Sequence, residues 1–429
     1  VYGGIYKQKF LGYAVRDFFE HGGTRCYVSR VVGLGAAIAK GVLKDLAGGN
    51  AITVNALSYG EWGNLITVST VKARAKLTEA AGIGATESSP VAVTHLKIDD
   101  VSQIEIGDVI KAGTEWFVVI AVSLPNKTIN VSSKTVTAPI PAETIVSVSS
   151  VHKNVAVTEE DLNGNVSSVK LSRTAGLTVG SIVTIADESQ VVNVIVRQIS
   201  GKTIMFDEIT LNIPILKGAI AVSQEFNLTV SEGDVVVEKH EFLSPVNDNE
   251  VDGIAVKLSG RGNQSSNIFA ESISNAGPFF GLPEADEVRL TDGNDGENAT
   301  PTDFIGNASG AKTGLYVFDG IKDVNMISVP SITDKSVVLA GIAYAEKRGD
   351  CMFITETPLE VDTVEEARDY RMRELNVDSS YAALYFPWIY EVDPKNPSRL
   401  IAIPPSGAVQ GIYADVAINR GVHKAPANE

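Results

Sequence analysis

Five histidines are the side chains of this chain best suited to bind a metal or to act as a general base. They are His21, His95, His152, His240 and His423. A helical zinc-hydrolase site needs two histidines four residues apart with a glutamate between them. No two of these histidines have that spacing, so the sequence predicts no metal site.

Glycine-rich turns are a second possible source of chemistry, because they bind the phosphates of nucleotides. Gly33-Leu34-Gly35-Ala36-Ala37-Ile38 resembles the start of a dinucleotide-binding turn. Ile38, however, stands where that turn needs a third glycine for close contact between helix and strand. The chain also has no G-x-x-x-x-G-K-[ST] loop. We therefore interpret residues 33–38 as a packing turn and expect no cofactor.

An acidic segment, residues 291–298, carries several oxygen atoms of the kind that bind calcium. An EF-hand loop places acidic or amide groups at positions 1, 3 and 5, and glycine at position 6. Counting from Asp292 puts Gly296 at position 5. We therefore interpret the segment as a turn that joins two elements.

Ser406 is the remaining candidate nucleophile. A nucleophilic serine needs an oriented activating base, and the sequence offers no triad that would supply one. We interpret Ser406 as a turn serine. With no catalytic, cofactor-binding or metal-binding residue assigned, the sequence predicts that the protein is not an enzyme.

Composition and charge narrow the class of protein further. The chain has 429 residues, of which 44% are hydrophobic and 21% charged, as is typical of ordered globular proteins with two or three domains. The formal net charge is −16, which repels phosphate groups, so we expect no nucleic-acid partner. No apolar run of about 20 residues occurs, so we expect no direct membrane insertion. Cys26 and Cys351 lie in apolar stretches and are expected to be reduced core residues.

Both ends of the chain are typical of an α/β layer. Apolar spacing predicts a helix from Leu11 that Gly22-Gly23 ends, and a β-branched strand follows at residues 25–32. Near the other end, strands and helices are predicted to alternate over residues 324–330, 336–348, 351–354, 363–375 and 381–386. Because parallel strands need crossover helices, we predict an α/β core with a mixed, mainly parallel sheet and flanking helices.

Between residues 72 and 224, helical periodicity disappears and short Val-, Ile- and Thr-rich runs alternate with turn residues, which predicts an all-β insertion in the core. The insertion is an internal repeat: Lys127-Thr128-Ile129 matches Lys202-Thr203-Ile204, and residues 104–110 match residues 177–183. We predict a discontinuous core of residues 1–71 and 225–429, a first outer β repeat at residues 72–149 and a second at residues 150–224.

The last segment, residues 404–428, has the most unusual composition. The Pro404-Pro405 pair favours an extended approach, and Pro426 favours an extended exit. Gly407 and Gly411 permit close backbone packing. These are structural properties, and none of them requires catalysis.

The same segment resembles the contractile-tail sheath family, which comprises bacteriophage tail sheath proteins and the sheaths of extracellular contractile injection systems. The resemblance rests on the pattern Pro-Pro-Ser-Gly-x-x-x-Gly-x-Tyr-Ala-x-x-x-x-x-Arg-Gly-Val-His-Lys-Ala-Pro-Ala-Asn at residues 404–428. Supporting matches lie at residues 18–27, 60–64, 327–330 and 385–389. They flank the β insertion.

The chain departs from the family pattern in two ways. Family members often carry an aspartate two positions beyond the Tyr-Ala pair, whereas Asp415 follows Ala414 directly; it is still near enough to Arg420 to pair. Family chains also begin earlier, with an N-terminal arm, and continue past the Ala-Pro-Ala-Asn signature into a domain that contacts the inner tube. We therefore expect the sequence to be a fragment.

The resemblance implies a structural function. Sheath subunits assemble as helically stacked hexameric rings around an inner tube, and contraction drives the tube through a target cell envelope. Terminal arms add strands to neighbouring subunits. The implied partners are other copies of the chain, the inner tail tube protein, and the baseplate and tail-terminator proteins. The implied location is the tail of a virion assembled in the bacterial host cytoplasm.

The resemblance also assigns structural or assembly roles to particular residues. Most of them shape the fold and exit of the last segment, and two tryptophans serve as core anchors. These residues are Pro405, Ser406, Gly407, Gly411, Asp415, Arg420, Gly421, Lys424, Pro426, Asn428, Trp62 and Trp388.

A second hypothesis is a surface-exposed binding protein whose two β repeats bind a receptor or a sugar, as in an adhesin. Exposed aromatic side chains on one face of the repeats would favour this function. Trp116 is the candidate in the first repeat, and its alternation with Val118 and Ile120 indicates core packing instead.

Overall fold

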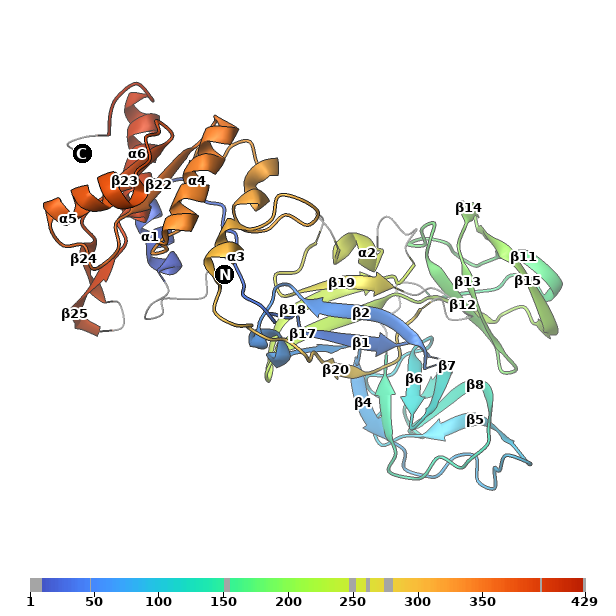
Figure 1. Ribbon diagram of the computed structural model, residues 1–429. Coiled ribbons are helices and arrows are strands. Elements are labelled where there is room, and N and C mark those ends of the chain that lie inside the picture. Colours follow the sequence, from blue (N-terminus) through green and yellow to red (C-terminus); the bar gives the residue numbers. More distant parts are fainter. Residues whose placement is uncertain are drawn as a thin grey trace. The chain divides into compact units, whose positions relative to one another are not determined.

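The computed structural model describes residues 10–46, 48–149, 155–246, 252–259, 263–273, 281–393 and 396–426. The chain divides into two compact units (Figure 1). Unit 1 comprises Val1–Gly35 and Gly296–Glu429, and unit 2 comprises Ala36–Asp295. Strands make up 40% of the protein and helices 18%.

The predicted fold class, a mainly parallel α/β core, is wrong. The protein is mostly β and its sheets are small. In the described residues the only strands paired in parallel are the three strands of one sheet in unit 1, and one isolated parallel bridge, Ser244–Gly253, lies in unit 2. The physical reason lies in the connections: crossover helices are present only between those three strands, and the other strands pair mainly with antiparallel neighbours, which need no crossover helix.

Unit 1 contains most of the described helices and the parallel sheet. Its elements are α1 (Leu11–Glu20), α3 (Pro301–Ile305), the 3₁₀ helix η3 (Gly314–Gly320), β21 (Met326–Ile327), α4 (Lys335–Arg348), β22 (Met352–Glu356), α5 (Val364–Asp369), the π-helical turn η4 (Tyr370–Leu375), β23 (Ala382–Tyr385), β24 (Ile389–Asp393), β25 (Asn396–Ile403) and α6 (Ser406–Arg420). The parallel sheet has the order β21-β22-β23, and β24 and β25 form a separate antiparallel pair.

Several predicted elements of unit 1 are confirmed. Helix α1 ends just before Gly22, whose φ is +100°. Helix α4 ends at Gly349, which has the left-handed φ of +72°. A capping box of Thr363 and Glu366 opens α5, so all three helix ends follow from the residues that cap or follow them.

The strand predicted at residues 25–32 is wrong, since these residues form neither helix nor strand. They have no neighbouring strand, and β propensity needs a pairing partner and a face to pack. Cys26 is accordingly only half-buried, whereas Cys351 is buried as expected. The strand predicted at residues 324–330 is reduced to the two residues of β21.

Unit 2 is built on two small antiparallel sheets that enclose a common apolar core. One has the order β1 (Lys40–Lys44), β2 (Asn50–Ala56), β19 (Ile268–Ile273), and the other has the order β18 (Val235–Leu243), β17 (Phe226–Glu232), β3 (Ile66–Ser69), β20 (Glu287–Arg289). A 3₁₀ helix, η1 (Glu61–Leu65), and a short helix, α2 (Ile254–Lys257), join them. Ile52, Phe226 and Ile268 are among the fully buried residues of that core.

The two sequence repeats form two small β-barrels whose strands follow the same order, as one sheet in the first copy and as two sheets in the second. The first has the order β4 (Ala73–Lys76), β9 (Ile145–Val148), β6 (Val109–Ala112), β7 (Glu115–Ser123), β8 (Thr128–Val136), β5 (Val91–Lys97). The second has the order β10 (Val155–Val157), β16 (Ile220–Ser223), β12 (Ile182–Ala186), β13 (Val191–Ile195), followed by β14 (Gln198–Ser200), β15 (Thr203–Ile215), β11 (Leu162–Lys170). Bridges Leu77–Ile98 and Thr158–Leu171 join the outer strands of each copy.

The repeats also share their backbone hydrogen bonds. Gly107 N–H donates to Val119 O at 2.7 Å, and Gly180 N–H donates to Val196 O at 2.8 Å. Both glycines have φ near +90°, at +91° and +88°, where a side chain is strained. Gly107 and Gly180 therefore occupy the same backbone turn in the two barrels, and this turn favours glycine.

The first barrel packs on the second through this turn. Val109 and Val118 lie in one apolar cluster with Ala186 of the second barrel. An ideal Cβ at Gly107 would lie 2.6 Å from the Val222 side chain. Close contact with the second barrel thus adds a second reason for glycine at position 107.

The two loops that the sequence analysis tested as nucleotide or calcium sites, residues 33–38 and 291–298, pack closely against other backbone segments. An ideal Cβ at Gly33 would lie 2.2 Å from Glu297 O, so Gly33 allows close backbone contact. In the acidic segment, the Asn64 side chain bonds both the N–H and the carbonyl of Gly293, at 2.8 Å each.

Replacement of Gly107 tests the contact between the barrels. We expect Gly107→Ala to lower the free energy of unfolding by about 2–4 kcal/mol, because it combines left-handed strain with overpacking against Val222. In the control Gly201→Ala, φ is +59° but no atom lies within 4 Å of the added Cβ. We expect the control to lose about 1 kcal/mol, from strain alone. Calorimetric unfolding compares the two variants, and equal losses would contradict the contact.

Candidate assembly surface

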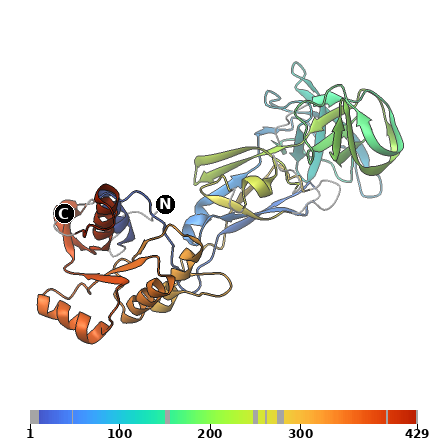
Figure 2. The same cartoon turned by 90° about the horizontal axis from the view of Figure 1, so that it is seen from above.

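Helices α1 and α6 approach each other closely through two glycines. An ideal Cβ at Gly407 would lie 2.3 Å from Ala14 O, and one at Gly411 would lie 2.6 Å from Phe18 O. Gly407 and Gly411 are four residues apart, so both lie on one face of α6. Figures 1 and 2 both show α1, in blue, beside α6, in red. The glycines let the two backbones touch where side chains would separate them.

The start of α6 differs from the extended approach expected from the proline pair. Pro405 has φ −72° and ψ −12° and directly precedes the first helical residue, Ser406. Proline suits this position because its fixed φ is already helical and its missing N–H would be unpaired anyway. Ser406 is the first residue of α6 and is fully buried, so it is a helix residue and not the turn serine expected from the sequence.

The end of α6 holds the other predicted residues. Arg420 is the last residue of α6, and Gly421, with φ +88°, donates its N–H to Ala417 O at 3.1 Å. The Asp415 carboxylate accepts a hydrogen bond from the Asn419 side chain at 2.8 Å. The Lys424 ammonium donates to Ala425 O at 3.0 Å.

Pro426 is the last residue of the chain that the structure describes, and Asn428 lies outside the described residues. The structure therefore brings Gly407 and Gly411 together against α1, and it buries Ser406 at the start of the same helix. It leaves Arg420 and Lys424 beyond that contact, at the exit of the helix.

The two tryptophans lie in different units. Trp388 is buried in unit 1, where its indole N–H donates to Thr357 O at 2.8 Å and the Phe10 ring packs on it edge-on, with 5.2 Å between ring centroids. Trp62 packs against the core of unit 2, and its indole N–H donates to Tyr59 O at 3.0 Å. Trp388 fixes the start of the segment that continues into β24.

The hairpin of β24 and β25 forms a separate two-stranded sheet in unit 1. In the described residues each of these strands pairs only with the other. Tyr390, Val392 and Leu400 lie on one face, by the pairings Tyr390–Ala402 and Val392–Leu400, and are 71%, 53% and 60% exposed. A two-stranded hairpin is only marginally stable by itself, and an open edge beside apolar side chains is a template for strand addition.

The other face of the hairpin is held to unit 1 by charge. Glu391 of β24 forms an ion pair with Arg16 of α1, and Arg16 also contacts the buried Asp17 carboxylate at 3.0 Å. Burial raises the pKa of Asp17 and of Glu391. Since removing Arg16 would leave a buried carboxylate without its cation, α1 and the hairpin are coupled through this residue.

A buried acid lies at the carboxyl end of the parallel sheet. Glu356, the last residue of β22, is buried and accepts a hydrogen bond from the Ser331 N–H at 2.6 Å. Burial raises the pKa of Glu356 to about 7, although that hydrogen bond opposes the change. On the next strand the Tyr385 hydroxyl is hydrogen-bonded to that of Tyr413 in α6 at 2.9 Å. These contacts join α6 to the sheet.

The described residues show no group of three or more His, Cys, Asp or Glu side chains that is placed to hold a metal ion. In the same part of the chain, no helix is both long enough and apolar enough to cross a membrane.

Sequence reasoning missed the hairpin. Its signal was present as alternation of apolar and polar residues at 389–393 and as apolar residues at 400–403, with Pro394 and Asn396 between them as turn residues. Most residues that were predicted to have structural or assembly roles lie instead within residues 404–428, because that segment carried the family resemblance.

Replacement of Gly411 tests the contact of α6 with α1. We expect Gly411→Ala to lower the free energy of unfolding of unit 1 by about 2–3 kcal/mol, because the atom facing the new methyl group is a backbone oxygen. In the control Gly320→Ala no atom lies within 4 Å of the added Cβ, and we expect a change within about 1 kcal/mol. Urea unfolding followed by the fluorescence of Trp388, in a background that carries Trp62→Phe and Trp116→Phe, measures both. A Gly411→Ala protein as stable as the control would refute the contact.

Glu356 makes stability depend on pH. Its folded-state pKa of about 7 lies above the ordinary 4.5, so the folded protein binds the proton more tightly than the unfolded chain. The associated stability is complete below about pH 4.5 and is lost as the pH rises to about 7. Between pH 5 and 8 we expect the wild type to lose on the order of 2–3 kcal/mol more than Glu356→Gln.

Urea unfolding at several pH values between 5 and 8 checks this expectation. Glu360→Gln, at an exposed acid of the same unit, is the control and should follow the wild type. Parallel profiles of the wild type and Glu356→Gln would show that Glu356 does not titrate in this range.

Comparison with known proteins gives no family assignment, since the chain matches no protein-family model and no curated protein sequence. The resemblance to contractile-tail sheath proteins stays a prediction from residues 404–428 and their supporting motifs. The observations that bear on function are therefore the geometry of unit 1 and its open hairpin.

Proposed function

We propose that this protein is a structural subunit of a contractile tail sheath, and that hairpin β24–β25 receives strands from neighbouring subunits. The observation that carries the proposal is the hairpin itself, which in the described residues has two unpaired edges and one exposed apolar face. It lies directly before the segment that resembles sheath proteins.

Strand addition would stabilise this hairpin in two ways. The N–H and C=O groups along its edges would gain backbone hydrogen bonds, each contributing about 1 kcal/mol net. Tyr390, Val392 and Leu400 would lose exposed apolar surface at the same time. A sheet of four strands would replace two strands that are marginal alone.

The attachment of the hairpin to unit 1 would transmit force from a neighbouring subunit. Glu391 is held by Arg16 of α1, and Trp388 is anchored at the start of β24. Helix α6 follows β25 directly and is packed on α1 through Gly407 and Gly411. A force applied to an added strand would therefore reach the body of unit 1 through the half-buried Arg16–Glu391 ion pair and the buried Trp388.

The remaining parts of the proposal follow from the resemblance. The subunits form stacked hexameric rings around an inner tube protein and meet the baseplate and the tail terminator at the two ends of the sheath. Contraction releases free energy stored in a metastable extended state and needs no nucleotide. The two barrels of unit 2 lie on the outside, in a virion tail assembled in the bacterial cytoplasm.

The alternative, a receptor- or sugar-binding function of the two β repeats, has no specific observation in its favour. Trp116 packs with the cluster between the barrels, and the Lys134 ammonium lies 4.5 Å from the centre of its ring. The aromatic group that would have favoured this function is thus engaged within the protein.

Electron microscopy of the complete gene product, with and without the inner tube protein, tests the proposed assembly. We expect rings or tubes from the wild type and none from Val392→Lys/Leu400→Lys, because two charges on the exposed face oppose strand addition. The matched control is Val317→Lys/Leu359→Lys, at two exposed apolar positions elsewhere in unit 1, which should assemble normally.

Two outcomes would contradict the proposal. Wild-type protein that forms neither rings nor tubes, even with inner tube protein supplied, would remove the sheath function. Normal assembly of Val392→Lys/Leu400→Lys would show that the hairpin is not the receiving surface.

A further inference from the structure

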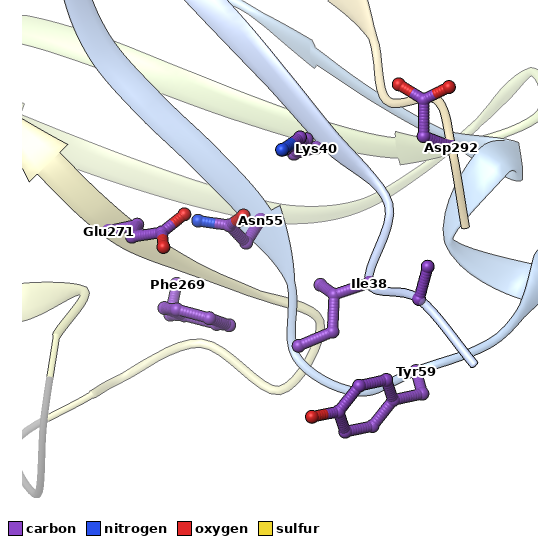
Figure 3. Close-up of a pocket in the computed structure, with 8 residues that line it drawn as sticks. Ile38, Lys40, Asn55, Tyr59, Phe269, Glu271 and Asp292 are labelled. Atoms are coloured by element: carbon purple, nitrogen blue, oxygen red, sulfur yellow. The ribbon is translucent and has the colours of Figure 1, made fainter. Parts of the chain in front are cut away.

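A pocket of about 330 Å³ lies on the outer face of the sheet β1-β2-β19 in unit 2 (Figure 3). Its lining includes Lys40, Asn55, Tyr59, Phe269, Glu271 and Asp292. The volume falls at the lower end of the range of small-molecule sites. This pocket is independent of the hairpin and of the proposed sheath function.

The centre of the pocket is a row of side chains across the three strands. Asn55 on the middle strand is opposite Lys40 on β1 and opposite Phe269 on β19. Directly paired residues of neighbouring strands present their side chains on the same face. A cation, an amide and an aromatic ring are therefore neighbours by register.

Asn55 is a buried donor without a partner. Its side chain lines the pocket and the residue is only 3% exposed, yet its amide nitrogen makes no hydrogen bond. Figure 3 shows the amide in the interior of the pocket, with its nitrogen on the side of Glu271. Buried donors are nearly always satisfied, so this amide points to an acceptor supplied from outside the chain.

Two backbone irregularities bring carboxylates to the same pocket. The pairing of β19 with β2 shifts between Ala270 and Ser272, which makes Glu271 the bulged residue. Asp292 has the left-handed φ of +67°. Bulges and left-handed residues re-aim side chains and concentrate at functional sites.

The charged side chains of the pocket can bind a ligand without first breaking a bond within the protein. Within the part of the chain that the structure describes, neither the Lys40 ammonium nor the Glu271 carboxylate has a hydrogen-bonding or ion-pair partner, and Asp292 accepts one hydrogen bond, from the Thr291 hydroxyl at 3.0 Å. One cation and two carboxylates give the pocket a net negative charge, which disfavours phosphates and other anions.

A strand cannot add at this place. The central strand β2 is already paired on both sides. The outer side of β1 is bridged at Lys40 to Thr291, and on the outer side of β19 the Ala270 N–H donates to Leu258 O at 2.7 Å. The ligand must therefore enter as a compact group over the face of the sheet.

We propose that this pocket binds a neutral saccharide. A hydroxyl group can accept from the Asn55 amide and donate to the Glu271 or Asp292 carboxylate, which a cation or a purely apolar ligand cannot do. Phe269 and Tyr59 supply rings against which the C–H faces of a sugar pack. Lys40 donates to further hydroxyl oxygens.

Binding to an array of neutral and acidic glycans, followed by saturation-transfer NMR with the best neutral monosaccharide or disaccharide, tests the proposal on the complete chain. We expect neutral glycans to bind and glycans with carboxylate or sulfate groups to bind at least tenfold more weakly. Binding of acidic glycans alone, or of no glycan, would overturn the proposal.

Substitutions of pocket residues test whether the glycan binds in this pocket. We expect Glu271→Gln and Asn55→Leu each to weaken binding at least tenfold, whereas Glu87→Gln, at an exposed acid of the first barrel, leaves it unchanged. Asn55→Leu has a second readout: because it removes an unsatisfied buried donor, it should raise Tm by about 2–4 °C in the absence of sugar. Binding that survives both pocket variants would place the sugar elsewhere and refute the assignment.

Discussion

The close contact of α6 with α1 is the constraint on which the rest of unit 1 depends. It joins the first helix of the chain to the last, and it requires glycine at positions 407 and 411 because backbone atoms occupy the space of a side chain. Helix α1 then presents Arg16 to Glu391, and α6 follows directly from β25. The hairpin is therefore attached to both helices of this close contact, to α1 by the ion pair and to α6 by the chain.

The sequence predicted the local elements of unit 1 well, because caps and apolar spacing act within a few residues. Gly349 ends α4 and the Thr363–Glu366 box opens α5, as expected. It did not predict the fold class, because strand direction depends on partners far away in the chain. Residues 25–32 have strand composition but no strand beside them, and much of unit 2 pairs in antiparallel hairpins.

The candidate sites differ in how far they could be predicted. The glycines of α6 were recognisable, since their spacing and the resemblance indicated close packing. The saccharide pocket was not, because Lys40, Asn55 and Phe269 become neighbours only through the register of three strands. Its one sequence signal, the acidic segment around Asp292, suggested calcium and failed on spacing. The orphaned amide of Asn55 is visible only once burial is known.

Hydrogen exchange of the backbone amides of β24 and β25, compared between free and assembled protein, tests the central claim most directly. Strand addition to the hairpin predicts fast exchange of its outward amides in the free protein and strong protection after assembly. The buried strand β22 should be protected in both states and serves as the internal reference. Assembled rings or tubes in which β24 and β25 exchange as fast as in the free protein would contradict the account.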